Sequence, residues 1–171
     1  MSAILEADMR ADSSLAVTTA VPVRDRWIQF AMGDEQYLIA VLEVQEVMRM
    51  LAVTPVPGTP PAVIGVINVR GRIVPVVDLA PLLGLGRQPD TEATRLVIFD
   101  LEDTAVALRV DRVAGVRLLD RNAIQPPPAA GMGPGKVPVS GVCDIDGHIL
   151  MVLDREALAT EFRHRPGAAE V

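Results

Sequence analysis

The fold is decided by the stretch Val63-Ile64-Gly65-Val66-Ile67-Asn68-Val69-Arg70-Gly71-Arg72-Ile73-Val74-Pro75-Val76-Val77-Asp78. Two runs rich in valine and isoleucine flank the dipeptide Arg70-Gly71, and a short Gly-containing turn between apolar runs is typical of a β-hairpin. Both runs are almost continuously apolar, which favours strands that are buried on both faces or curved into a barrel. We therefore predict a hairpin over residues 63–77.

An earlier segment shows the same pattern, because residues 27–32 and 36–41 flank the turn sequence Gly33-Asp34-Glu35. Hydrophobic residues make up 50% of the 171-residue chain but aromatic residues only 3%, so aliphatic side chains must build the core. Valine in particular favours strands, because its branched β-carbon stiffens the side chain. The chain is therefore predicted to be mainly β.

The two halves of the sequence repeat each other. A shift of 69 residues places Ile28, Phe30, Tyr37, Ile39, Val41, Val44 and Val47 on Val97, Phe99, Val106, Leu108, Val110, Val113 and Val116. A shift of 76 residues places Gly65, Val66, Gly71, Ile73, Val76 and Asp78 on Gly141, Val142, Gly147, Ile149, Val152 and Asp154. The difference is a seven-residue insertion near the loop Pro126–Pro138. Matching glycines and aspartates indicate an internal duplication.

The duplication predicts two tandem β-barrel subdomains of five short strands each, because closure of such small sheets removes exposed edges. We place the first subdomain at about residues 25–90 and the second at about 91–163, with flexible tails at 1–24 and 164–171. Asp78 and Asp154 each precede a helical pattern, so a short helix with an aspartate N-cap is expected after each.

Composition and charge exclude several classes of function. The net charge of −6 argues against binding to nucleic acid or to anionic membranes, which requires a basic face. One cysteine and two histidines allow neither an internal disulfide nor a Cys/His zinc cluster. The longest uncharged stretch, residues 51–69, is interrupted by prolines and glycines, and no targeting signal is visible, so a cytosolic protein without membrane insertion is expected.

Three segments resemble catalytic or metal sites without completing them. The phosphate-loop-like residues 131–136 are followed by Val137, where magnesium binding needs serine or threonine. The segment Asp144-Ile145-Asp146-Gly147 lacks the later ligands of a calcium loop and is interpreted as a hairpin turn. Cys143 is predicted to be a small buried side chain. We predict no catalytic residues, no metal and no cofactor.

Two charged residues in apolar surroundings are candidates for a binding surface. Glu46 interrupts the run around Val44 and Val47, and Arg70 occupies a turn at which the second half has Asp146. Exposed charges of this kind are often only solvated and then contribute little. The alternative is that Glu46 and Arg70 pair and fix a contact surface for another protein, because arginine is enriched at interface hot spots.

Several segments together resemble the CheW family of bacterial chemotaxis coupling proteins. The resemblance is carried by Phe30-x-Met32-Gly33-Asp34-Glu35-Gln36-Tyr37, Val44-Gln45-Glu46-Val47, Pro55-x-Pro57-Gly58-x-Pro60, residues 65–79, residues 110–116 and Ile124-Gln125-Pro126-Pro127. It covers about residues 27–158, and its most specific part is Asn68-x-Arg70-Gly71-x-x-x-Pro75-x-x-Asp78-Leu79. The chain departs from the family pattern in a longer N-terminal tail and in a Pro/Gly-rich loop at residues 126–138.

The resemblance implies a fold, partners and site residues. The implied fold is two SH3-like five-stranded barrels side by side. The implied role is an adaptor that binds the CheW-like regulatory domain of the histidine kinase CheA and the cytoplasmic tip of methyl-accepting receptors. Such a protein would be cytoplasmic and associated with receptor arrays. The implied partner-binding residues are Val44, Glu46, Gly65, Asn68, Arg70, Val113 and Val116.

Three alternatives stay open at this point. A CheW-like coupling protein could serve a non-flagellar pathway such as pilus motility or a second-messenger circuit. A small-ligand-binding barrel could use the apolar interior as a pocket, although few aromatic or hydrogen-bonding groups are available to line it. An enzyme is the weakest alternative, because no acid–base pair is visible.

Overall fold

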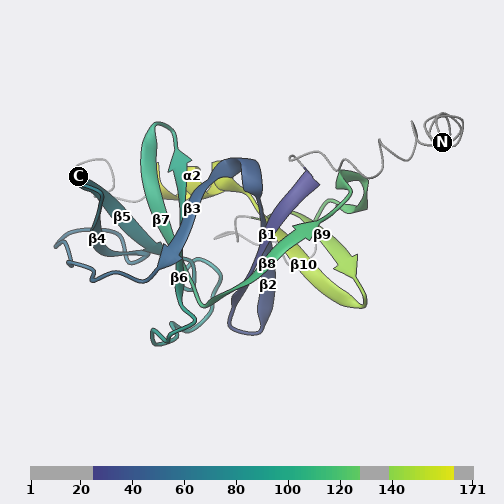
Figure 1. Ribbon diagram of the computed structural model, residues 1–171, viewed down its shortest axis with the longest axis horizontal. Coiled ribbons are helices and arrows are strands. Elements are labelled where there is room, and N and C mark those ends of the chain that lie inside the picture. The colour runs from purple at the N-terminus through teal and green to yellow at the C-terminus, as the bar shows by residue number, and fades with distance from the viewer. Residues whose placement is uncertain (1–24, 128–138, 164–171) are drawn as a thin grey trace, which may run out of the picture.

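The computed structural model describes residues 25–127 and 139–163, and this part of the chain forms two adjacent β-sheets (Figure 1). The strands are β1 (Arg26–Met32), β2 (Glu35–Ala40), β3 (Val44–Arg49), β4 (Val63–Val69), β5 (Arg72–Asp78), β6 (Arg95–Leu101), β7 (Thr104–Val110), β8 (Arg112–Leu118), β9 (Val139–Ile145) and β10 (His148–Leu153). The helical elements are the 3-10 helices η2 (Val41–Glu43) and η3 (Arg121–Ala123) and the α-helix α2 (Arg155–Arg163). The two expected tails and the phosphate-loop-like segment 131–136 lie outside the described residues.

The predicted hairpins and the predicted mainly β fold are confirmed. β1 pairs with β2, and β4 pairs with β5, in antiparallel register. The turn between β4 and β5 has positive φ at Arg70 (50°) and Gly71 (84°), which is the backbone geometry of a tight two-residue hairpin turn. The β9–β10 hairpin repeats it with Asp146 at 53° and Gly147 at 83°.

The sheets do not follow the expected division of the chain near residue 90. The strand order is β8-β1-β2-β10-β9 in the first sheet and β3-β6-β7-β5-β4 in the second. We call β1–β5 the N-terminal repeat and β6–β10 the C-terminal repeat. Each sheet takes the first two strands of one repeat and the last three strands of the other. The barrels are therefore exchanged reciprocally between the repeats rather than arranged in tandem.

Short connections explain the exchange. Between β2 and β3 the chain has only the three residues of η2, and between β7 and β8 it has only Asp111. So short a connection cannot lead the third strand back to the first strand of its own repeat. The third strand therefore enters the other sheet. There β3 pairs with β6, and β8 pairs with β1. The expected boundary was wrong because sequence periodicity predicts strands but not their partners.

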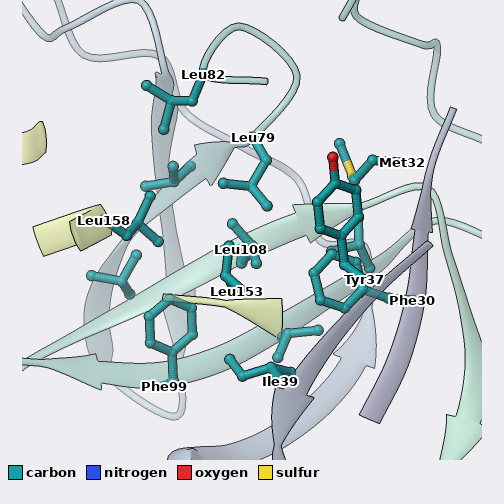
Figure 2. Packing of buried hydrophobic residues seen from close by; sticks show 14 of the residues in the cluster. Phe30, Met32, Tyr37, Ile39, Leu79, Leu82, Phe99, Leu108, Leu153 and Leu158 are labelled. Carbon is teal, nitrogen blue, oxygen red and sulfur yellow. The ribbon is translucent and has the colours of Figure 1, made fainter. Parts of the chain in front are cut away.

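Three apolar clusters stabilise this arrangement. One fills the second barrel with residues such as Ile67, Val74 and Ala107, and one fills the first with residues such as Trp27 and Leu38. The third and largest cluster lies between the sheets and contains Phe30, Met32, Tyr37, Ile39, Leu79, Leu82, Phe99, Leu108, Leu153 and Leu158 (Figure 2). Because the last cluster draws side chains from both sheets, the two barrels form one body. The buried position predicted for Cys143 is confirmed, since it belongs to the core of the first barrel.

One of the two predicted helices is absent. Asp154 caps α2 as expected, since its Oδ1 accepts from Glu156 N (3.0 Å) and Ala157 N (3.1 Å). Asp78 Oδ1 accepts from Ala80 N (2.9 Å), but residues 79–84 form a turn rather than a helix. Gly84, with φ of +70°, ends this turn, which is closed by backbone hydrogen bonds from Leu83 N to Leu79 O and from Leu85 N to Ala80 O.

Glu43 at the end of η2 provides a pH-dependent contribution to stability. Burial raises the pKa of its carboxyl above the ordinary value, and Asp154 and Glu156 add to the effect while Arg155 and Arg121 oppose it. A raised folded-state pKa means that this group stabilises the fold below the unfolded-state pKa. That stabilisation is lost as the pH rises through the folded-state pKa.

We therefore expect Glu43→Gln to raise the free energy of unfolding by about 0.5 kcal/mol near neutral pH. The glutamine keeps the shape of the protonated acid and removes the buried charge. Urea unfolding of both proteins should show this gain at about pH 7 and coincident curves at about pH 4, where Glu43 is protonated anyway. A variant that is less stable than wild type at about pH 7 but not at about pH 4 would show that the contacts of the carboxylate with arginine outweigh the cost of its burial.

Candidate interaction surface

An exposed ion pair links the two opposite edges of the second sheet. Glu46 lies on β3, and Arg70 lies in the turn between β4 and β5. Arg70 Nη2 donates to Glu46 Oε1 at 3.0 Å, and Arg70 Nη1 donates to Glu46 Oε2. β3 and β4 are the first and last strands of this sheet, so the pair links its opposite edges. The pairing of Glu46 with Arg70 expected from the sequence is therefore present in the structure.

The pair holds a charged group in a defined position at the surface. The Arg70 side chain is 74% exposed, whereas that of Glu46 is 27% exposed. The hydrogen bond from Arg70 lowers the pKa of Glu46, and the carboxylate raises the pKa of Arg70 in turn. Two parallel hydrogen bonds fix the orientation of a guanidinium plane. Arg70 thus offers an oriented donor face to solvent.

Asn68 shapes the turn that carries Arg70. Its Oδ1 accepts from Gly71 N at 2.8 Å, which stabilises the positive φ angles of the turn. Asp144 performs the same task in the β9–β10 hairpin, where its Oδ1 accepts from Gly147 N at 2.9 Å. The structure therefore gives Asn68 a local role in positioning Arg70.

The remaining candidates of the second sheet are less exposed. Val44 on β3 is half-buried and packs against the core between the sheets. Gly65 on β4 is buried, with φ of +149°. A Cβ at this position would lie 2.3 Å from Thr54 O, in the strand segment that bridges to Val66. The structure thus explains Gly65 by close backbone packing.

Val113 and Val116 lie apart from the ion pair, on β8 at the edge of the first sheet. Val113 is half-buried against the core between the sheets, whereas Val116 is 64% exposed. The predicted residues therefore divide into two groups. One group surrounds the Glu46–Arg70 pair, and the other follows the β8 edge.

The ion pair marks a difference between the repeats. Gly115 occupies the place of Glu46 in the C-terminal repeat, and Asp146 occupies the place of Arg70. Gly115 is exposed, and no atom lies within 4 Å of the position that its Cβ would take. The two barrels therefore present different charges at equivalent places, as the sequence comparison predicted.

Two exposed isoleucines were not singled out as site residues in the sequence. Ile73 is 67% exposed on β5, and Ile149 is 57% exposed on β10. They are related by the same shift of 76 residues that aligns the glycines, but sequence reasoning assigned them only to strands. Their exposure next to the hairpin turns could not be predicted, because it depends on how each barrel closes.

The described residues contain no group of three or more histidine, cysteine, aspartate or glutamate side chains placed to hold a metal ion. None of the helices in the described ranges has the length and apolar character needed to cross a bilayer. Asp146 and Gly147 form the hairpin turn that the sequence indicated instead of a calcium loop.

Comparison with known proteins gives a consistent family assignment. The CheW-like domain family matches residues 26–163. A probable chemotaxis protein CheW from Rhizobium etli is 28% identical over 78% of this chain and 86% of its own length. The scaffolding protein TtCheW from Thermoanaerobacter tengcongensis superposes with a TM-score of 0.70 at 29% identity, covering 78% of this chain and 86% of that structure. Protein PilI of Pseudomonas aeruginosa is 36% identical over 53% of this chain and 51% of its own length.

Proposed function

The chain belongs to the CheW-like family of chemotaxis scaffold proteins, and we propose that it joins a CheA-type histidine kinase to the cytoplasmic tips of chemoreceptors. It does so as an adaptor without a reaction of its own, at receptor arrays on the cytoplasmic side of the membrane. The family match over residues 26–163 carries this proposal. PilI matches only about half of the chain, so a role outside chemotaxis has weaker support.

Two separate surfaces on one body support the adaptor role. The Glu46–Arg70 pair belongs to the second sheet, and the exposed edge with Val116 belongs to the first. Because a shared core joins the sheets, a partner on one surface is held at a fixed position relative to a partner on the other. Such an arrangement raises the effective concentration of the kinase at the receptor.

Arg70 is the residue of this surface that we expect to contribute most to binding. Its guanidinium is exposed yet fixed by Glu46, so little side-chain freedom is lost when a partner binds. The interiors of both barrels are filled with apolar side chains, which argues against the alternative of a ligand-binding barrel.

We expect Arg70→Ala to weaken binding of the kinase domain, the receptor tip or both by about 2 kcal/mol, because arginine is a frequent hot-spot residue. Titration calorimetry with each partner measures this loss. The free energy of unfolding should change by less than about 1 kcal/mol, because the pair is exposed. Arg72→Ala is the matched control, since it removes the same charge from the same hairpin without touching Glu46. Unchanged affinity for both partners would refute the role of Arg70.

The role of Glu46 is separated from that of Arg70 by exchanging the two charges. Glu46→Ala frees Arg70 and should reduce affinity less than Arg70→Ala does, because the cation remains. The double variant Glu46→Arg with Arg70→Glu restores an ion pair but places a carboxylate at the turn. If Arg70 itself contacts the partner, this variant still fails to bind; recovered binding would assign the pair a purely structural role.

A further inference from the structure

Every strand pairing outside the hairpins connects the two repeats. Within a repeat, the strands pair only as the hairpins β1–β2, β4–β5, β6–β7 and β9–β10. The four other pairings are β8 with β1, β2 with β10, β3 with β6, and β5 with β7, and each connects the N-terminal to the C-terminal repeat. None of these contacts requires that both repeats belong to the same molecule.

The covalent connection between the repeats is largely exposed. Leu79, Leu82 and Leu83 after β5 are buried in the core between the sheets, and Thr94 before β6 is buried as well. Residues 86–93 between them, which we call the inter-repeat linker, are all exposed. The nine peptide steps from Leu85 to Thr94 could span about 30 Å if fully extended, roughly the diameter of a small domain.

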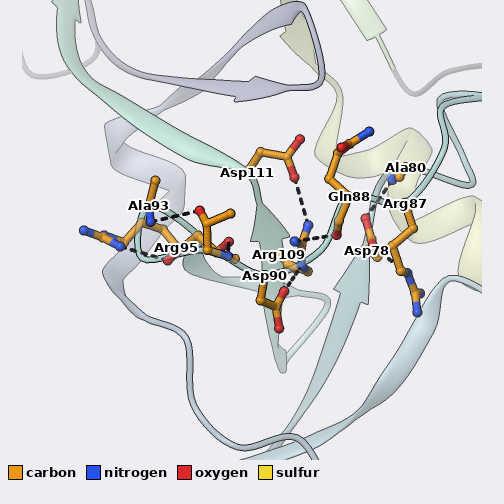
Figure 3. A network of polar contacts seen from close by, with 11 residues as sticks. Asp78, Ala80, Arg87, Gln88, Asp90, Ala93, Arg95, Arg109 and Asp111 are labelled. Carbon is orange, nitrogen blue, oxygen red and sulfur yellow. Dashed lines mark hydrogen bonds and ion pairs between the residues drawn. The ribbon is translucent and has the colours of Figure 1, made fainter.

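A buried arginine holds this linker against the second sheet. The Arg109 side chain on β7 is 2% exposed. Its Nε donates to Asp90 Oδ1 (2.6 Å), and its Nη2 donates to Gln88 O (2.9 Å) (Figure 3). Its Nη1 donates to Asp111 Oδ1 (3.0 Å), and Asp111 Oδ2 accepts from Gly33 N (2.7 Å) in the β1–β2 turn. The linker is thus tied to both sheets through one guanidinium.

This contact shortens the free part of the linker. Arg109 and Thr94 both belong to the C-terminal repeat. In an exchanged dimer, a linker held by Arg109 of its own chain leaves only the three peptide steps from Leu85 to Gln88 to connect the two bodies. A linker held by Arg109 of the other copy leaves only the four steps from Asp90 to Thr94. Fully extended, four steps reach at most about 14 Å, which is too short to connect two separate bodies of this size. While Arg109 holds Asp90, the C-terminal repeat must therefore pair with the N-terminal repeat of its own chain.

We propose that two copies of this chain can exchange repeats, and that the contact of Arg109 with the inter-repeat linker keeps the chain in its unexchanged, monomeric form. In the exchanged dimer, each N-terminal repeat pairs with the C-terminal repeat of the other copy. Both bodies keep every strand pairing and all three cores, so only the path of the linker differs. The dimer would carry two complete sets of binding surfaces on two bodies, which the inter-repeat linkers of both chains join.

The test compares two single-charge variants of the linker in the full-length chain. Asp90→Asn weakens the contact with Arg109, whereas Glu92→Gln removes the same charge two residues away without a side-chain contact to Arg109. Exchange requires the strand pairings to open, so each protein is unfolded in urea and refolded at increasing concentration. Light scattering after chromatography should show an association constant about tenfold higher for Asp90→Asn than for wild type. Glu92→Gln should behave as wild type.

A disulfide placed between the repeats distinguishes exchange from ordinary dimerisation. Arg26 on β1 and Leu118 on β8 are cross-strand neighbours, and both are exposed. With Arg26→Cys and Leu118→Cys, the bond forms within one chain in the monomer and between chains in the exchanged dimer. Dimers of Asp90→Asn joined by interchain disulfides support the proposal. No increase in dimer over Glu92→Gln, or a dimer with only intrachain disulfides, would overturn it.

Discussion

Replacing Gly65 with alanine should destabilise the protein by about 3 kcal/mol or more, because two independent effects add. The φ angle of +149° is strained for any residue with a Cβ. The new Cβ would also lie 2.3 Å from Thr54 O and 2.6 Å from Val53 Cγ1. Thr54 cannot move away freely, because its N–H and C=O are both bonded to Val66 at 2.9 Å. Urea unfolding measures the loss.

Two other glycines provide the controls for this prediction. Gly71 also has a positive φ, but no atom lies within 4 Å of its Cβ position, so Gly71→Ala should cost only about 1 kcal/mol for the strain. Gly141 is the repeat equivalent of Gly65, and its Cβ would lie 2.5 Å from Ile124 Cγ2 and 3.0 Å from Gln125 O. The Ile124 side chain can shift and Gly141 has no positive φ, but Gln125 O is backbone, so Gly141→Ala should fall between the two. A loss at Gly65 no larger than that at Gly71 would contradict the argument from close packing.

The buried position of Gly65 favours a structural role over a direct contact with a partner. Resemblance to the CheW family implied that it is a partner-binding residue, yet its position is buried beneath the Thr54–Val66 bridge. We expect weaker partner binding by Gly65→Ala to follow from a smaller folded fraction. Binding measured at a temperature at which the variant is fully folded separates this effect from a direct contact, which would remain impaired there.

The local parts of the fold could be predicted from the sequence. Turns such as Arg70-Gly71 and Asp146-Gly147 depend on neighbouring residues only, because Gly at the second turn position takes the positive φ that the turn requires. The repeat was visible because equivalent glycines keep their spacing where a crossing segment leaves no room for a Cβ, as at Gly65 and Gly141. The mainly β class followed from the valine-rich composition together with short apolar runs separated by turn residues.

The exchange of strands between the repeats could not be predicted. Both tandem and exchanged barrels place the same residues in strands and bury the same faces, so the apolar pattern is identical for the two. The deciding features are the length of η2 and the single residue Asp111 between β7 and β8, and these become visible only when the strand ends are known. Resemblance to the CheW family implied two barrels but did not state which strands form each of them.

Charged residues were predicted where their neighbours in the sequence mark them, and they were missed where their partners lie far along the chain. The Glu46–Arg70 pair was predicted because each charge interrupts an apolar pattern and the repeats differ there. Arg109 was overlooked, although it too lies in an apolar run, because its acceptors come from the linker 19 and 21 residues earlier. A charged residue predicted in a buried strand is thus a reason to look for partners in the adjoining loops.

Separating the chain into residues 1–90 and 91–171 should abolish folding of either fragment alone, yet a mixture of the two should recover the native fold. Alone, each fragment retains two hairpins and one unpaired strand, because its other strand partners lie in the other fragment. An isolated hairpin is at best marginally stable in water. Circular dichroism and urea unfolding should therefore show a cooperative transition for the refolded mixture and none for the single fragments.

A protease site inserted after Asp90 in the full-length chain provides the control for this experiment, because the protein then folds before it is cut. Residues 86–93 are exposed, so cleavage should proceed in the native state. The cut protein should elute at the size of the intact chain and separate only in denaturant, because four strand pairings and the core between the sheets hold the halves together. A single fragment that unfolds cooperatively as a monomer would show that its strands can pair within one repeat, and would contradict the interlocked fold.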